Sequence, residues 1–155
     1  MNHVELLLHN IRSVYNTAAI FRTAECLGVK KIWLSGYTPA PIDRFGRERS
    51  DFHKVALGVE QIIPWEQADD FMKVITDHRD DGFVAVALEQ AANSIALQNF
   101  KARSPVLLIP GTETIGVDEI IMNSVDQIVE ISQVGTKESL NVMSATAIAL
   151  WQLLQ

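Results

Sequence analysis

Short apolar runs alternate with amphipathic segments along this chain, and this alternation predicts strands and helices in turn. Two of the runs, FVAVAL and VLLI, contain no polar residue, which is typical of strands buried on both faces of a sheet. The predicted strands are Val4–Leu8, Lys30–Ser35, Ile62–Ile63, Phe83–Leu88, Val106–Ile109 and Gln127–Ile131.

Apolar residues recur at helical spacing between these runs. The predicted helices are Thr17–Leu27, Glu66–His78, Val117–Asn123 and Ser139–Leu154. Asn16 stands where the first helix needs an N-cap, and Gly28 lies just past its end. Gly36–Ser50 contains two prolines and three arginines, which predicts a long surface loop. Together the segments predict one α/β domain over residues 1–155, with a mostly parallel sheet that binds ligands beyond the carboxyl ends of its strands.

The composition excludes several classes of protein. The single cysteine, Cys26, excludes an intramolecular disulfide framework and a four-cysteine zinc site, and we expect it to be a small core residue of its helix. The four histidines show no spacing typical of metal ligands. No apolar run is long enough to span a membrane, and the first residues lack the pattern of a signal peptide. We therefore expect a cytoplasmic protein without a metal or a membrane partner.

Charge is distributed unevenly along the chain. The net charge is −6, yet residues 1–56 hold eight Lys and Arg against five Asp and Glu, a local charge of +3. The remaining residues carry −9. This asymmetry is compatible with an anionic ligand on one side of an acidic protein, and equally with scattered solvated charge.

Three segments are polar where a core-forming pattern would not require it. In Asn16–Glu25, Arg22 points away from the apolar face of its helix; Gly111-x-Glu113-x-x-Gly116 forms a turn after a buried strand; and Ser139–Val142 opens the closing helix. Each segment has an ordinary structural explanation: an exposed ion pair with Glu25, a strand-to-helix turn, and an N-cap.

In this order, the segments resemble the three motifs of the SpoU, or TrmH-like, branch of the SPOUT RNA 2′-O-ribose methyltransferases. They read N-x-x-A-x-x-R-T-A-E-x-x-G, G-x-E-x-x-G and I-x(7)-S-L-N-V, and the resemblance covers essentially the entire chain. It implies an α/β domain with a C-terminal trefoil knot. It also implies a homodimer that binds S-adenosylmethionine in the knot and has its active site at the subunit interface.

The resemblance also implies roles for individual residues. The residues that match catalytic positions are Arg22, Asn16, Glu113, Ser139 and Asn141. The residues that match cofactor-binding positions are Leu88, Gly111, Ile131, Ser139 and Leu140. Since the pKa of arginine is about 12.5–13.8, we interpret Arg22 as a phosphate clamp that orients the target nucleotide rather than as a base.

The function implied is transfer of a methyl group from S-adenosylmethionine to a ribose 2′-hydroxyl of tRNA or rRNA. The need for a 2′-hydroxyl makes RNA, not DNA, the substrate. The residues that we expect to bind RNA are Arg12, Arg44, Arg47, Arg49 and Lys54. An apolar stripe along the closing helix, which includes Met143 and Trp151, is compatible with a homodimer or with a core helix.

Two alternatives stay open at this point: a catalytically inactive knotted RNA-binding homodimer, and an α/β domain that binds a different adenosine-containing molecule such as ATP or NAD.

Overall fold

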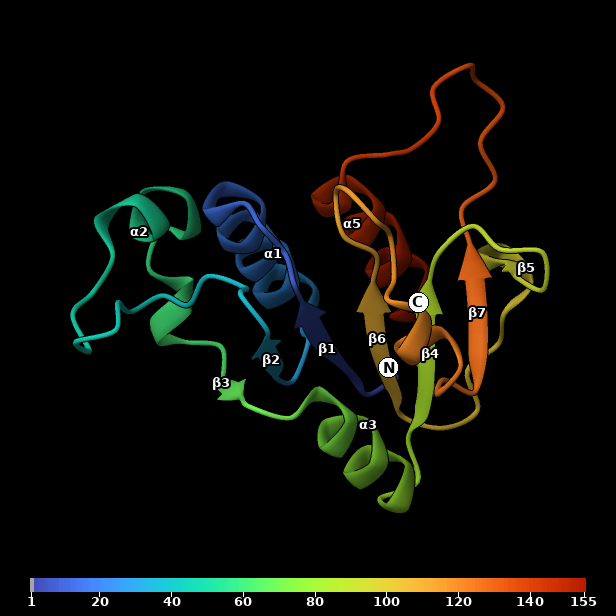
Figure 1. Cartoon of the computed structure of the whole chain (residues 1–155), viewed down its shortest axis with the longest axis horizontal. Helices are drawn as coiled ribbons and strands as arrows, with labels where there is room; N and C mark the ends of the chain where they lie inside the picture. Colours follow the sequence, from blue (N-terminus) through green and yellow to red (C-terminus); the bar gives the residue numbers. More distant parts are fainter. Residues whose placement is uncertain (1) are drawn as a thin grey trace.

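The computed structural model describes residues 2–155, which form one seven-stranded sheet flanked by helices (Figure 1). The strand order is β3-β2-β1-β6-β4-β7-β5, and every strand pair is parallel. The strands are β1 (Val4–His9), β2 (Ile32–Ser35), β3 (Trp65–Ala68), β4 (Val84–Leu88), β5 (Ile95–Ala96), β6 (Val106–Pro110) and β7 (Gln127–Glu130). The predicted α/β class with a mostly parallel sheet is confirmed.

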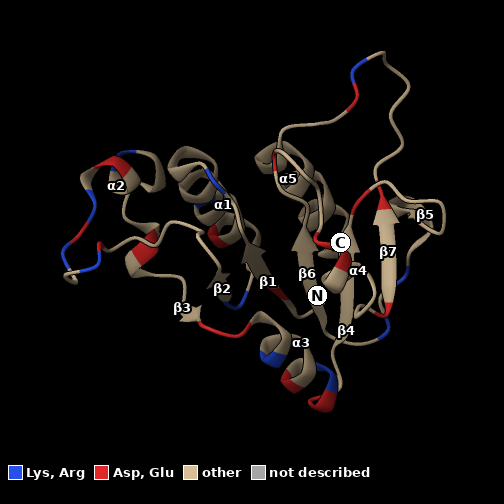
Figure 2. Ribbon diagram, in the orientation of Figure 1, with Lys and Arg blue, Asp and Glu red and all other residues tan. Residues whose placement is uncertain are grey.

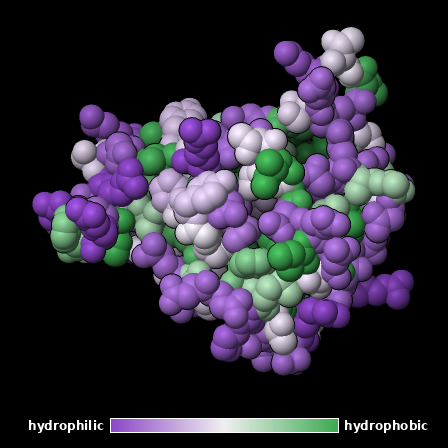
Figure 3. Space-filling model, in the orientation of Figure 1, coloured by the Kyte–Doolittle hydropathy of each residue, from purple (hydrophilic) through white to green (hydrophobic). Residues whose placement is uncertain are grey.

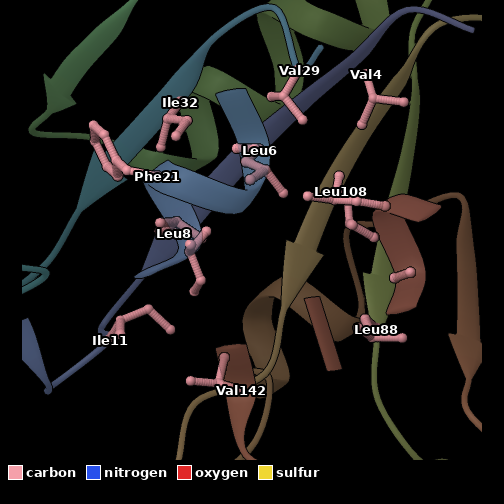
Figure 4. Packing of buried hydrophobic residues seen from close by; sticks show 14 of the residues in the cluster. Val4, Leu6, Leu8, Ile11, Phe21, Val29, Ile32, Leu88, Leu108 and Val142 are labelled. Carbon is pink, nitrogen blue, oxygen red and sulfur yellow. The ribbon is translucent and has the colours of Figure 1, made fainter. Parts of the chain in front are cut away.

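Helices cover both faces of the sheet. The α-helices are α1 (Val14–Leu27), α2 (Ser50–Ala56), α3 (Phe71–Asp80), α4 (Glu119–Met122) and α5 (Val142–Leu153), and the short 3-10 helices are Val59–Gln61 and Leu97–Asn99. On one face, α1, α2 and α5 pack on a core that includes Leu6, Leu8 and Leu108 (Figure 4). On the other face, α3 and α4 pack on Leu7 and Leu107. Adjacent residues of β1 and β6 thus point to opposite cores, as the continuous apolar runs predict.

Helices α1 and α5 begin at other residues than predicted. Both differences affect residues predicted to be functional. Helix α1 begins at Val14, because the hydroxyl of Ser13 accepts a hydrogen bond from the Asn16 amide at 3.1 Å. Asn16 is therefore not the N-cap, and its side chain is available for other contacts. Helix α5 begins at Val142 with Asn141 as its N-cap, so Ser139 and Leu140 lie in the preceding loop.

The predicted strand Ile62–Ile63 is wrong. These residues follow the 3-10 helix Val59–Gln61, and the strand of this region is β3, which pairs with β2. The predicted helix from Glu66 therefore begins only at Phe71, where Asp70 accepts hydrogen bonds from two backbone amides. Pairing with an existing strand outweighs the weak helical preference of a few residues.

Cys26 is exposed on α1, so its assignment to the core is wrong. Helix α2 and strand β5 have no counterpart in the prediction. Within residues 2–155, no helix has the length and apolar character needed to cross a membrane.

On the face of the sheet that α3 covers, Glu5 of β1 pairs with His78 of α3. Nε2 of His78 lies 3.0 Å from the Glu5 carboxylate, and Nδ1 lies 2.7 Å from the Val74 carbonyl oxygen. Because both ring nitrogens face acceptors, the geometry favours the doubly protonated ring. Burial disfavours that charge, but the hydrogen bonds to Glu5 and Val74 outweigh it and raise the pKa of His78. Burial likewise opposes ionisation of Glu5, and hydrogen bonds from His78 and Trp33 lower its pKa to about 2.

This pair predicts a pH optimum of stability. The contribution of His78 is complete below its ordinary pKa of 6.5 and is lost as the pH rises through its higher folded pKa. The contribution of Glu5 is complete above its ordinary pKa of 4.5 and is lost as the pH falls toward 2. We expect His78→Gln to destabilise the protein more at about pH 5.5 than at about pH 9 in urea unfolding. An equal loss at both pH values would contradict this account.

Candidate functional site

The three polar segments of the sequence meet at the carboxyl ends of the central strands. The Asn16 side-chain amide donates a 2.8 Å hydrogen bond to Oε1 of Glu113, which lies 97 residues further along the chain. The Asn141 side-chain amide donates to Oδ1 of Asn16 at 3.3 Å across 125 residues. Residues from all three segments thus form one hydrogen-bonded chain, Asn141 to Asn16 to Glu113, which we call the three-residue network.

Each amide in the network has only one consistent orientation. Oδ1 of Asn141 accepts from the backbone amide of Met143 at 2.8 Å, so its amino group faces Asn16. Asn16 must then present its oxygen to Asn141 and its amino group to the Glu113 carboxylate. Asn16 itself is buried, which makes loss of a partner costly. The network therefore fixes the start of α5 against α1 and the turn that follows β6.

Glu113 is held as a carboxylate. Burial works against its ionisation, but hydrogen bonds from the Asn16 side chain and from backbone amides, including that of Arg12, outweigh this and lower the pKa of Glu113. A carboxylate with a lowered pKa is a weak general base and is not a proton donor near neutral pH. The geometry therefore favours a positioning role for Glu113.

A pocket lies beside the network, at the carboxyl ends of β4, β6 and β7. All five predicted cofactor-binding residues line it: Leu88, Gly111, Ile131, Ser139 and Leu140. Glu113 lines it as well. The resemblance to the SpoU family implies one site for these residues, which come from four separate segments, and the fold brings them together.

The pocket is acidic, which the sequence analysis missed. Four glutamates line it: Glu89, Glu113, Glu130 and Glu138. Among the described residues that line it, none is Lys, Arg or His. Glu130 is the last residue of β7, and Glu138 lies in the long connection from β7 to α5. Only the fold shows that both residues border the same pocket as the end of β4.

Glu89, directly after β4, explains both glycines of the second motif. Its Oε2 accepts a hydrogen bond from the Val117 amide at 2.8 Å and lies against Gly111 and Gly116. A Cβ atom would lie 2.6 Å from this oxygen at Gly111 and 2.2 Å at Gly116, where φ is +72°. A larger residue at either position would displace the Glu89 carboxylate, and at Gly116 the positive φ would also strain any other residue.

Arg22 lies outside this pocket. It is six residues beyond Asn16, about 9 Å along the axis of α1. Its side chain is exposed and lines an open groove between α1 and α5, with apolar and aromatic neighbours such as Met143, Ile148 and Trp151. Among residues 2–155, the ion pairs formed by arginine and lysine do not include Arg22. The pair with Glu25 that would give Arg22 an ordinary structural role is therefore absent.

The predicted RNA-binding loop carries less unpaired positive charge than its composition suggests (Figure 2). Arg47 pairs with Asp43 at 2.8 Å, and Arg49 pairs with Asp51 at 2.9 Å. Arg44 has no such carboxylate among the described residues and lies near the ring of Phe45. Lys54 is exposed on α2, and Arg12 is exposed near the three-residue network.

In the part of the chain that the structure describes, no group of three or more His, Cys, Asp or Glu side chains is arranged to hold a metal ion.

Known proteins share both the sequence pattern and the fold. The chain is 26% identical to a tRNA (guanosine(18)-2′-O)-methyltransferase of Aquifex aeolicus, over 92% of this chain and 64% of that protein. It is 23% identical to the 23S rRNA (guanosine-2′-O-)-methyltransferase RlmB of Haemophilus influenzae, over 99% of this chain and 60% of that protein. The chain spans less than two thirds of the length of most curated relatives that it matches.

Solved structures of RNA-modifying enzymes share this fold. An AdoMet-bound rRNA methyltransferase from Sinorhizobium meliloti superposes with a TM-score of 0.86 at 26% identity, over 97% of this chain and 55% of that one. The TrmH/SpoU tRNA modifying enzyme of A. aeolicus gives 0.85 at 22% identity, over 99% and 75% of the two chains. The model of the SpoU rRNA Methylase family matches residues 3–151. The chain belongs to the SpoU rRNA Methylase family.

Proposed function

We propose that this protein is an S-adenosylmethionine-dependent methyltransferase that methylates a ribose 2′-hydroxyl of tRNA or rRNA. The observation that carries the proposal is the three-residue network at the edge of an acidic pocket with apolar walls. The relatives named above are guanosine 2′-O-methyltransferases of tRNA and rRNA, which supports this substrate class. The intact network favours an enzyme over an inactive RNA-binding protein.

The pocket suits S-adenosylmethionine by charge and by polarity. S-adenosylmethionine supplies a methyl group on a positively charged sulfonium and carries a cationic ammonium group. Four glutamates favour such a ligand, and Leu88, Ile131 and Leu140 offer apolar contact to an adenine ring. ATP and NAD carry phosphates, and among the described lining residues no cation is present to neutralise them.

Within this proposal the residues divide into two groups. Asn16, Glu113 and Asn141 position the loops around the pocket, and Ser139 offers a hydroxyl at its edge. Arg22 clamps a phosphate of the RNA and aligns the target ribose, because a guanidinium binds phosphate in a bidentate fashion. Arg12, Arg44, Arg47, Arg49 and Lys54 attract the RNA backbone.

Titration calorimetry tests the choice of ligand directly. We expect S-adenosylmethionine and S-adenosylhomocysteine to bind in the micromolar range and ATP to show no measurable heat. A matched variant, Glu130→Gln, should weaken S-adenosylmethionine more than S-adenosylhomocysteine, because only the former carries the sulfonium charge. Binding of ATP or NAD without binding of either adenosyl compound would refute the proposal.

The proposed enzyme is a homodimer formed through the groove between α1 and α5. Large apolar side chains border this groove, and Tyr15, Ile148 and Trp151 are 59%, 44% and 60% exposed. Two copies of the groove facing each other would bury these side chains and bring Arg22 of one subunit to the other subunit. This arrangement explains why an arginine with no ion pair among the described residues stands among apolar side chains.

We expect Trp151→Glu to convert the dimer to a monomer in sedimentation velocity at about 10 µM and to abolish methylation, because a carboxylate would be buried in the interface. The fold should survive, since Trp151 is exposed on α5. Ile120→Glu is the matched control, because Ile120 is 58% exposed on α4, which covers the other face of the sheet. A Trp151→Glu protein that sediments like the unaltered protein would contradict the proposed interface.

The trefoil knot and the cytoplasmic location also belong to this proposal. The knot is supported by the path of the chain after β7: the long connection leaves the sheet and returns to α5, which packs on α1 and on β6 (Figure 1). A methyltransferase of tRNA or rRNA would meet its substrate in the cytoplasm.

A further inference from the structure

The loop between β2 and α2 ends in a small, well-defined hairpin, residues 42–48, which we call the Phe45 hairpin. An antiparallel bridge between Ile42 and Glu48 closes its base. The Asp43 carboxylate accepts hydrogen bonds from the amides of Phe45 at 2.8 Å and Arg47 at 3.0 Å, and from Nε of Arg47 at 2.8 Å. Gly46 supplies the left-handed conformation of the turn, with φ of +77°. The hairpin is thus fixed by internal hydrogen bonds.

This hairpin presents an aromatic ring to solvent. Phe45 is 67% exposed, although its backbone is held in place on both sides. The guanidinium carbons of Arg44 and Arg47 lie 4.7 Å and 5.1 Å from the ring centre. Both guanidinium groups lie over the ring, and most of the surface of Phe45 is nevertheless exposed. Figure 3 shows an apolar area enclosed by strongly hydrophilic residues at the left margin, where this loop lies.

We propose that Phe45 is a stacking platform for an unpaired base of the RNA substrate. Aromatic rings stack on any base, and neighbouring cations engage the phosphates on either side of it. The ion pair with Asp43 holds Arg47 at the ring. Arg44 has no carboxylate partner among the described residues and is available to a phosphate. A protein partner would need a wider apolar surface, whereas the neighbours of Phe45 are charged. The inference rests on the proposed function and adds the kind of RNA structure that is bound.

The test compares single-stranded with duplex RNA. The probe is a fluorescein-labelled oligoribonucleotide of about 12 nucleotides, alone or annealed to its complement, measured by fluorescence anisotropy. We expect Phe45→Ala to weaken binding of the single strand by about 5- to 100-fold, the effect of losing one base–aromatic stack. Phe45→Leu should lose as much, since leucine has no π face, and Phe45→Trp should retain affinity. Duplex binding and the salt dependence should not change, because no charge is removed.

Ile62→Ala is the matched control, because Ile62 is a similarly exposed apolar residue, at 68%. An unchanged single-strand affinity in Phe45→Ala, or an equal loss in Ile62→Ala, overturns the inference and leaves the proposed function intact if the unaltered protein still methylates RNA. If the unaltered protein binds S-adenosylmethionine but neither binds nor methylates RNA, the proposed function fails and the stacking platform fails with it.

Discussion

Replacing Arg22 with alanine should lower the single-turnover rate of RNA methylation by about 100-fold or more, from misalignment of the target ribose alone. Arg22 is exposed, and no ion pair of it occurs among residues 2–155, so the fold should not depend on it. It also lies outside the pocket of its own subunit, and in the proposed dimer it binds RNA rather than S-adenosylmethionine. Thermal unfolding and S-adenosylmethionine affinity should therefore remain close to those of the unaltered protein.

Two further variants test whether the effect is specific to the guanidinium of Arg22. Arg22→Lys should also be slow, because an ammonium cannot reproduce a planar bidentate clamp on phosphate. Arg103→Ala removes another exposed arginine and should leave the rate nearly unchanged. If Arg22→Ala retains more than about a third of the rate of the unaltered protein, Arg22 has no catalytic role.

Asn16→Asp should be the most damaging single change in the three-residue network. It replaces the amino group that donates to Glu113 at 2.8 Å with a carboxylate oxygen, so two negative charges face each other. We expect a loss of about 1–3 kcal/mol in the free energy of unfolding near pH 7, the cost of breaking a hydrogen bond to a charged group at a buried position. We also expect a loss of at least about tenfold in methylation, because the loops around the pocket shift.

The double variant Asn16→Asp/Glu113→Gln should recover most of this loss. The glutamine amide can donate to the new carboxylate, and the second oxygen of that carboxylate can still accept from Asn141. Urea unfolding of the two single variants and the double variant gives the coupling energy between positions 16 and 113. Additive losses, with no recovery in the double variant, would mean that the hydrogen bond does not organise the site.

The sequence predicts the central strands of the sheet better than the edge strands. The runs that become β1, β4, β6 and β7 are buried on both faces, and such runs predict strands independently of their partners. The edge strands β3 and β5 depend on pairing with distant segments. Trp65–Ala68 is a strand because β2 lies beside it, and no local pattern of these four residues predicts that pairing.

The site could be predicted as a set of residues but not as an arrangement. The resemblance to the SpoU motifs identifies Asn16, Glu113 and Asn141. The interpretation of Asn16 as an N-cap gives no indication of its long-range hydrogen bonds. Ser13 three residues earlier is an equally good N-cap, and it is Ser13 that caps α1. The acidic character of the pocket arises from glutamates at the ends of different segments, which only the packing of the strands brings together.

The position of Arg22 has a different explanation. Helical spacing correctly indicates that it points away from the core. The apolar stripe of the closing helix is compatible with a homodimer or with a core helix. Its members Met143 and Trp151 border the open groove, because α5 packs through Thr146, Ala149 and Leu150. In a single chain no described residue covers this groove. The role of Arg22 therefore depends on whether a second chain packs there, which the sequence of one chain does not predict.

Transfer of a labelled methyl group to RNA tests the central claim most directly. The protein is incubated with methyl-tritiated S-adenosylmethionine and RNA from cells in which its gene is deleted, with DNA of the same sequence content as a control. A methyl group on a ribose 2′-oxygen blocks alkaline cleavage of the adjacent phosphodiester, so we predict label in alkali-stable dinucleotides of the RNA and none in DNA. A protein that binds S-adenosylmethionine yet leaves no such label, or labels only the bases, would contradict the proposed function.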